Sequence, residues 1–283
     1  MNNYLLIGLE SLIDHIGSIR DLGIVYWKKA NKKMQIGDII DYHGGLHDLR
    51  EGIVRTVFDA DLSVGSDPRK YFRSCRFAAK YGFRMDDALD KALKENTEAL
   101  KRINEDNAVY QTVSGLNGGF ALKFFQLMDK YKVTDFLLTS MSNYLHTTAY
   151  DTFILGVLGA FDEEGDADMA LCYAAVFWPR FSDEIAGKSS VTDAETENIL
   201  NTILNGNASA FRFAKVGYGD YSYVPPYIQD VWSLQLAMTD DANMTDSKAK
   251  AIRAKEHYAE ARRFLKARAA VDKSLVKYAN YWN

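Results

Sequence analysis

The sequence predicts a mainly α-helical protein with a small N-terminal β part. Beyond residue 67, apolar side chains recur at helical intervals in the stretches 114–137, 150–161, 166–178 and 194–206. Only four prolines interrupt the chain. The 283 residues are 47% hydrophobic, which is enough for one large core or two to three small ones. We therefore expect a globular array of packed helices.

The first sixty residues are expected to contain a short β-hairpin. Paired glycines at 44 and 45 allow a tight turn, and residues 53–57 (IVRTV) are typical of a short strand. An amphipathic helix is predicted over 5–23. Glu10 and Asp14 share one face of it, but no other feature marks a metal site, so a solvated face is favoured.

The segment 67–83 (DPRKYFRSCRFAAKYGF) predicts a helix with clear ends. Asp67 and Pro68 form a start signal, and Gly82 suits a stop. Cations recur along one face at Arg69, Arg73, Arg76 and Lys80, and apolar residues can face a core. Such a stripe is either a solvated face or a surface that holds phosphates.

Breaks between later helices are expected around 104–118, 161–168, 182–193 and 217–227. The pair Pro225-Pro226 is expected to break the chain before long C-terminal helices.

Two motifs in fixed order carry a family resemblance. Residues 41–55 follow the pattern D-x-x-G-G-x-x-D-L-x-x-G-I-x-R, and D-P-x-[RK]-x-x-R-x-x-R-F follows at 67–77. Further anchors are 170–181 (ALCYAAVFWPRF), 228–238 (IQDVWSLQLAM) and 260–272 (EARRFLKARAAVD). Together they resemble the class II RNA nucleotidyltransferases, and bacterial poly(A) polymerase more than CCA-adding enzymes.

The resemblance implies a domain order. It predicts a truncated head remnant with a short hairpin at 1–60, a helical neck at 61–125, a helical body at 126–215 and a helical leg at 216–283. Arg20-Asp21-Leu22 is similar to the family's last head strand. Family members hold two catalytic metal ions on a D-x-D pair in the head. The forty residues before Asp41 contain no such pair. The expectation is therefore no catalytic residue, no metal site and no cofactor of the chain's own.

The base-reading motif of that family, E-D-x-x-R, is degenerate here. Ser66 replaces the glutamate, Asp67 remains and Lys70 replaces the arginine. A lysine cannot reproduce the planar two-pronged contact of a guanidinium. Arg73 and Arg76 match the next pair of family arginines, either as nucleotide ligands or as structural partners. The resemblance thus assigns a degenerate nucleotide motif to Asp67, Lys70, Arg73 and Arg76.

Charge is spread unevenly along the chain. The net charge is +3 over 61–103, −13 over 104–246 and +7 over 247–283, with −4 overall. The cationic parts are expected to follow RNA phosphates, or to dock on an acidic partner or on the chain's own acidic middle segment. The proposed RNA contacts are Arg69, Lys80, Arg262, Arg263, Lys266 and Arg268. Ala237, which follows Leu236, stands where the family has an arginine, and this loss weakens the expectation of RNA contacts.

Compartment and membrane association follow from composition. Cys75 and Cys172 lie in apolar helical contexts and are expected to be buried thiols in a reducing, cytoplasmic environment. The N-terminus lacks the pattern of a signal peptide, and no apolar stretch is long enough to span a bilayer.

Three functions stay open at this point. The first is a non-catalytic homologue that binds RNA, such as a tRNA or a 3′ end. The second is a subunit of an RNA nucleotidyltransferase whose head domain is supplied by another polypeptide. The third is a protein–protein adaptor that has lost RNA binding.

Overall fold

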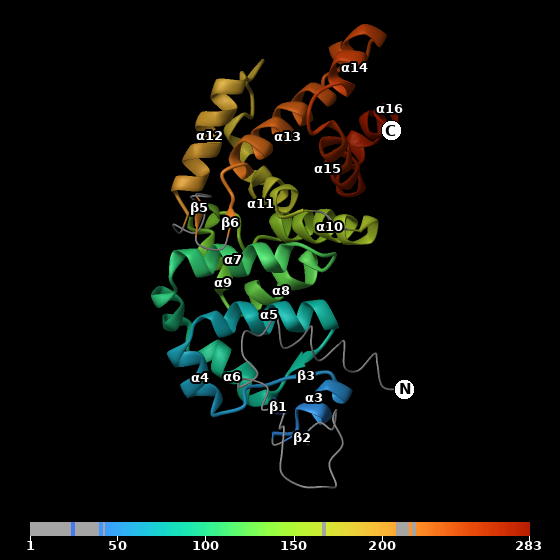
Figure 1. The fold of residues 1–283 in the computed structure, drawn as a ribbon. Helices are drawn as coiled ribbons and strands as arrows, with labels where there is room; N and C mark the ends of the chain where they lie inside the picture. Colours follow the sequence, from blue (N-terminus) through green and yellow to red (C-terminus); the bar gives the residue numbers. More distant parts are fainter. Residues whose placement is uncertain (1–23, 26–39, 42, 166–167, 208–214, 217–218) are drawn as a thin grey trace. The chain divides into compact units, whose positions relative to one another are not determined.

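The structure is a computed structural model that describes residues 24–25, 40–41, 43–165, 168–207, 215–216 and 219–283 (Figure 1). It is mainly α-helical, as the sequence predicts. The chain forms two compact units, Met1–Arg102 and Ile103–Asn283. The finer division into head remnant, neck, body and leg stays a prediction. Glu10, Asp14 and the segment 20–22 lie outside the described residues.

The first unit combines short strands with helices. In chain order its elements are β1 (Ile24–Val25), β2 (Ile40–Asp41), α3 (Gly45–Glu51), β3 (Ile53–Val54), α4 (Ala60–Ser66), α5 (Arg69–Tyr81), β4 (Arg84–Met85), α6 (Asp87–Glu95) and η1 (Thr97–Arg102). Strands β1 and β2 pair antiparallel. Strands β3 and β4 pair in parallel, with Ile53 opposite Arg84. A parallel pair needs a crossover, and α4 and α5 supply it.

Helix α5 has the ends that the sequence predicts. Pro68 is its N-cap and Gly82 ends it in the left-handed conformation at φ +67°. Its Tyr71, Phe72 and Cys75 side chains are fully buried. The expected strand at 53–57 is shorter than predicted. It ends at Val54, because only Gly52, Ile53 and Val54 find partners on the segment around β4.

The second unit is an array of helices. They are α7 (Glu105–Leu116), α8 (Ala121–Lys130), α9 (Val133–Leu137), α10 (Thr148–Glu164), α11 (Met169–Glu184), α12 (Asp193–Asn205), α13 (Val224–Met238), α14 (Asp246–Arg253), α15 (Tyr258–Val271) and α16 (Val276–Tyr281), with short 3₁₀ turns between some of them. A two-residue pair, β5 (Lys215–Val216) with β6 (Gly219–Asp220), precedes α13.

Two expected breaks are wrong in detail. Most of the region 104–118 is α7, whose N-cap Asn104 accepts from the backbone N–H groups of Asp106 and Asn107. The Pro225-Pro226 pair does not precede a helix but sits in the first turn of α13. Proline is tolerated there, because the first backbone N–H groups of a helix have no partner within the helix.

Helix α11 is the buried centre of the second unit. Every residue from Met169 to Trp178 is buried, and α7, α10, α12, α13 and α15 all pack on it. Trp232 of α13 donates to the Ala174 carbonyl at 3.0 Å. Its indole stacks on Phe181 with ring centroids 4.3 Å apart. This aromatic centre fixes the surrounding helices.

Helices α10 and α15 lie side by side because a glycine permits the approach (Figure 1). A Cβ atom at Gly156 of α10 would stand 2.3 Å from the Val271 Cγ2 atom of α15. Trp282, near the end of the second unit, is buried and donates from its indole to the Met238 carbonyl at 2.6 Å.

Both cysteines are buried thiols, as the sequence predicts. Burial raises the pKa of the Cys172 thiol, which keeps it protonated. Among the described residues, no helix is both long and apolar enough to cross a membrane.

Candidate functional site

The first motif, residues 41–55, folds into a turn, a short helix and a strand. Gly44 takes a left-handed conformation at φ +75° just before α3, and Gly52 does the same at φ +63° after it. The Arg55 Nε atom lies 2.7 Å from Asp48 Oδ2. The motif's aspartate and arginine therefore form an ion pair that joins α3 to the chain after β3. Sequence reasoning quoted both residues but did not predict the pair.

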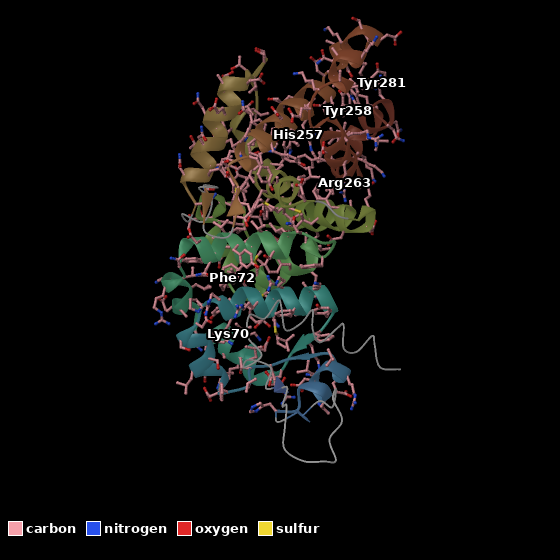
Figure 2. All side chains as sticks on the ribbon, in the orientation of Figure 1. Lys70, Phe72, His257, Tyr258, Arg263 and Tyr281 are labelled. Carbon is pink, nitrogen blue, oxygen red and sulfur yellow. The ribbon has the colours of Figure 1, made fainter. Side chains whose placement is uncertain are left out.

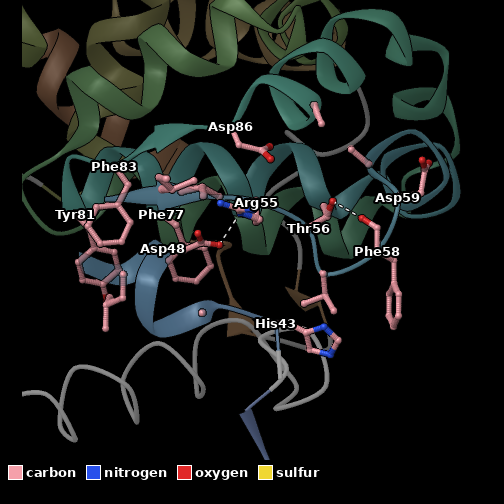
Figure 3. Close-up of a pocket in the computed structure, with 17 residues that line it drawn as sticks. His43, Asp48, Arg55, Thr56, Phe58, Asp59, Phe77, Tyr81, Phe83 and Asp86 are labelled. Atoms are coloured by element: carbon pink, nitrogen blue, oxygen red, sulfur yellow. Dashed lines mark hydrogen bonds and ion pairs between the residues drawn. The ribbon is translucent and has the colours of Figure 1, made fainter. Parts of the chain in front are cut away.

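A cavity of about 390 Å³ lies beside this ion pair (Figure 3). Its aromatic wall comes from Phe77, Tyr81 and Phe83, whose rings contact one another around the end of α5. Asp48 and Arg55 supply polar groups to the same cavity. The arrangement can hold a planar or apolar group next to a paired charge. The signal in the sequence was the set of aromatic residues flanking Gly82, which sequence reasoning passed over.

None of the residues of the degenerate nucleotide motif lines this cavity; its α5 wall is formed by Phe77 and Tyr81. Asp67 instead acts locally. Its carboxylate accepts from the Arg69 backbone N–H at 3.0 Å and from the Arg69 guanidinium through two bonds of 2.8 Å. Burial acts to raise the pKa of Asp67, but the hydrogen bonds and charge of Arg69 outweigh it and leave this pKa below its ordinary value. Asp67 therefore anchors the start of α5.

The cations of α5 do not form one exposed stripe. Arg76 is only 4% exposed, and its guanidinium lies 5.4 Å from the Phe77 ring centroid. Arg69 is engaged with Asp67, and Arg73 is half-buried. Lys70 lies near the helix start (Figure 2) and is half-buried too, whereas Lys80 at the end is exposed. The interpretation of four solvent-facing cations is thus wrong for Arg76.

Helix α15 carries two kinds of cation. Arg263 turns inward, where it donates to the Phe161 carbonyl at 2.6 Å and to the Gly165 carbonyl. Its Nε atom lies 3.3 Å from Glu164 Oε2, and Lys266 pairs with the same carboxylate. Arg263 therefore ties α15 to the end of α10. In addition, Glu164 of the acidic segment 104–246 neutralises part of the positive charge of the segment 247–283. This matches one of the alternatives that the charge pattern left open.

Arg268 is a structural residue as well. Its guanidinium lies 4.0 Å from the Trp178 ring centroid and donates to Gln235 Oε1 at 2.9 Å. Burial lowers the pKa of Arg268 to about 9. This pKa still leaves the side chain charged at neutral pH.

The exposed cations of this region are fewer than the sequence predicted. Arg262 is exposed, and Lys266 keeps 67% of its side chain exposed although it pairs with Glu164. Lys250 and Lys255 are also exposed. In the described part of the chain, no ion pair involves Arg262, Lys250 or Lys255. Arg262 and Lys266 are four residues apart and so share one face of α15.

Comparisons with known proteins explain the motifs. No family model matches the chain. The chain is 24% identical over 210 residues to poly(A) polymerase I of Escherichia coli O6:H1, an alignment that covers 70% of this chain and 44% of that enzyme. It is 29% identical over 91 residues to the CCA-adding enzyme of Lactobacillus helveticus, covering 32% of this chain and 23% of that enzyme. The chain is a homologue of the class II nucleotidyltransferases.

The homology to class II nucleotidyltransferases agrees with the fold. A solved structure titled tRNA-processing enzyme (apo form I) matches 86% of this chain and 59% of its own length, with a TM-score of 0.55 at 16% identity. The chain spans less than half the length of the poly(A) polymerases that it matches. Within the described ranges, no group of three or more histidine, cysteine or acidic side chains is arranged to hold a metal ion.

Proposed function

We propose that this homologue of class II nucleotidyltransferases binds RNA, as a tRNA or an RNA 3′ end, through the exposed face of α15. The observation that carries the proposal is the placement of Arg262 and Lys266. They are exposed on one face of the helix, while Arg263 between them is used inside the protein. Lys255, just before α15, adds a further exposed cation. Such a row of cations suits a phosphate backbone.

The first unit contributes secondary contacts in this proposal. Lys80 and the half-buried Lys70 and Arg73 are its phosphate-binding candidates. Arg69 pairs with Asp67 instead, and Arg76 is buried. The C-terminal helix divides in the same way, with Arg263 and Arg268 as positioning residues for the exposed pair.

The salt dependence of tRNA affinity tests this proposal. Each lost phosphate contact should reduce the slope of log K against log salt by roughly 0.7–0.9. The Arg262→Ala/Lys266→Ala double variant should therefore lose about 1.4–1.8 units of slope and bind more weakly. Lys123→Ala/Lys188→Ala is the matched control, because it removes two exposed cations from the same unit. An equal loss in both variants would contradict the assignment to α15.

We further propose that the chain does not transfer nucleotides by itself. The support is the state of the base-reading motif. Lys70 stands where the family has an arginine, and the Asp67 carboxylate is occupied by Arg69. A primer-extension assay with ATP or CTP and magnesium should show no incorporation above background. Incorporation that persists in purified protein would overturn this part. Incorporation that appears only on addition of a separate head-domain polypeptide would support the subunit alternative.

A protein–protein adaptor is the second candidate function. Two observations favour it: part of the C-terminal charge is neutralised within the chain, and two apolar side chains of the first unit are exposed, Phe58 at 73% and Leu62 at 74%. If the protein binds neither tRNA nor single-stranded RNA even at low salt, the adaptor function replaces RNA binding.

A further inference from the structure

A second cavity, of about 320 Å³, lies wholly inside the second unit. It opens where the start of α10, the end of α11 and the end of α15 meet. Phe153, Trp178 and Pro179 supply apolar walls, and Ala149 stands at its exposed rim. It is separate from the residues proposed above to touch phosphates. Its size is at the lower end for pockets that enclose small ligands, so it suits one compact group.

The cavity presents a partly buried cation. Arg268 lines it, stacked on Trp178 and fixed by its hydrogen bond to Gln235. Among the described residues, no carboxylate lies within 4 Å of this guanidinium, so its charge has no direct ion-pair partner. A guanidinium has five N–H donors, and Gln235 accepts from one of its nitrogens. The remaining donors are available to a ligand that offers acceptors.

Two carboxylates line the same cavity. Asp183 accepts from the Tyr144 hydroxyl at 2.9 Å, which leaves it further lone pairs. The pKa of Tyr144 is raised to about 12, first by burial and then by Asp183, so it remains a neutral donor. Asp272 accepts from the Ser274 backbone N–H at 2.9 Å. With one cation and two anions, the lining opposes a strongly anionic ligand and favours a neutral one with both donors and acceptors.

We propose that this cavity holds a single guanine base of a bound RNA, turned out of its strand. Guanine offers acceptors at O6 and N7, the atoms that arginine contacts in specific nucleic-acid complexes. Arg268 donates to that edge, and Asp183 accepts from the N1–H and N2–H₂ edge. The planar ring lies between Phe153 and the other apolar walls. Unstacked single-stranded bases are the usual target of sequence-specific RNA recognition. The inference rests on the proposed RNA-binding function but concerns a different part of the surface.

Nucleoside binding to the full chain tests the cavity without RNA. Guanosine should bind at least about fivefold tighter than adenosine, since a good bidentate contact discriminates between bases by about that much or more. Guanosine monophosphate should bind no tighter than guanosine, because Asp183 and Asp272 oppose its phosphate. Equal binding of all four nucleosides, or no saturable binding, would overturn the proposal.

Two variants and one control locate the site. Ala149→Phe places a ring at the exposed rim and should abolish guanosine binding. Asp183→Asn should lose the preference for guanosine, whereas Glu184→Gln, the same charge change at the next residue, which does not line the cavity, should keep it. Unfolding midpoints equal to that of the unmodified protein would show that the variants are folded. Guanosine binding that survives Ala149→Phe would contradict this location.

Oligouridine with and without one central guanosine separates this inference from the proposed function. The guanosine should strengthen binding by about tenfold, and Ala149→Phe should remove that gain but leave the salt slope unchanged. Arg262→Ala/Lys266→Ala should reduce the slope but keep the gain. RNA binding with no preference for the guanosine would overturn this inference alone. If the protein binds guanosine but no RNA, the proposed function is overturned, and so is the claim that the base in the cavity belongs to a bound RNA.

Discussion

Helix α15 is held on α10 by a close approach at Gly156, and replacing this glycine by alanine should loosen it. The added Cβ would stand 2.3 Å from Val271 Cγ2, which is too close for any real contact. Overpacking of this kind costs about 1–3 kcal/mol. Alanine also gains about 1 kcal/mol of helix propensity over glycine, which offsets part of the loss.

Gly159, one turn further along α10, removes this ambiguity. A Cβ there would meet Leu122 Cδ2 at 3.5 Å, an ordinary contact. Gly159→Ala therefore gains the same helix propensity without the overlap. The free energy of unfolding of Gly156→Ala should be lower than that of Gly159→Ala by about 1–3 kcal/mol.

Urea unfolding of the two variants measures this difference. Adding Val271→Ala should rescue Gly156→Ala, because it removes the overlapping methyl group. The double-mutant cycle should give a coupling of about 0.5–3 kcal/mol between the two positions. Equal stabilities for Gly156→Ala and Gly159→Ala, or a rescue of zero, would refute the packing of α15 on α10 as described.

Three further predictions concern single contacts. Asp67 has a lowered pKa in the folded protein, so its charge contributes stability at neutral pH, and this stability is lost as the pH falls through the pKa of the folded state. Asp67→Asn should therefore make the free energy of unfolding less sensitive to pH below about 4. Acid titration of both proteins measures this difference. Arg263→Ala should lower the free energy of unfolding by about 1–3 kcal/mol, because two carbonyls lose their donor. Glu164→Gln should lower it by at most about 1 kcal/mol. Denaturant titrations of both variants measure these losses. The Cys172 thiol should react with a maleimide only after denaturant is added, since burial raises its pKa and covers it; prompt labelling in native buffer would count against the described core.

The sequence predicted most of the helical fold because local signals determine it. The ends of α5 follow from Pro68 and Gly82, which act through backbone geometry alone. The Asn and Gly residues around α7 are typical of a loop, but packing against α8 and α11 accompanies a helix there. Asn104 proved to be a helix cap. The Pro225-Pro226 pair indicates a break between elements, but proline is equally allowed in the first turn of a helix, where α13 places both residues.

The candidate site was less predictable, because side-chain partners come from segments far apart in the chain. Arg262 and Arg263 are adjacent, and the sequence treats them alike. Only the packing of α15 on α10 turns one toward Glu164 and leaves the other exposed. Arg268 likewise belongs to a cavity most of whose lining comes from the distant segment 144–183. Charge counts point to the region 247–283 but do not tell which of its cations are exposed.

Site-specific crosslinking tests the central claim most directly. Ala259 is exposed and lies three residues before Arg262 on α15, so Ala259→Cys places a benzophenone label beside the proposed contacts without removing them. Both native cysteines are buried and should stay unlabelled. The account predicts that tRNA crosslinks at position 259, and that a label at Lys188→Cys in the same unit gives only background. Equal crosslinking at both positions, or none at 259 when tRNA is bound, would contradict an RNA-binding face on α15.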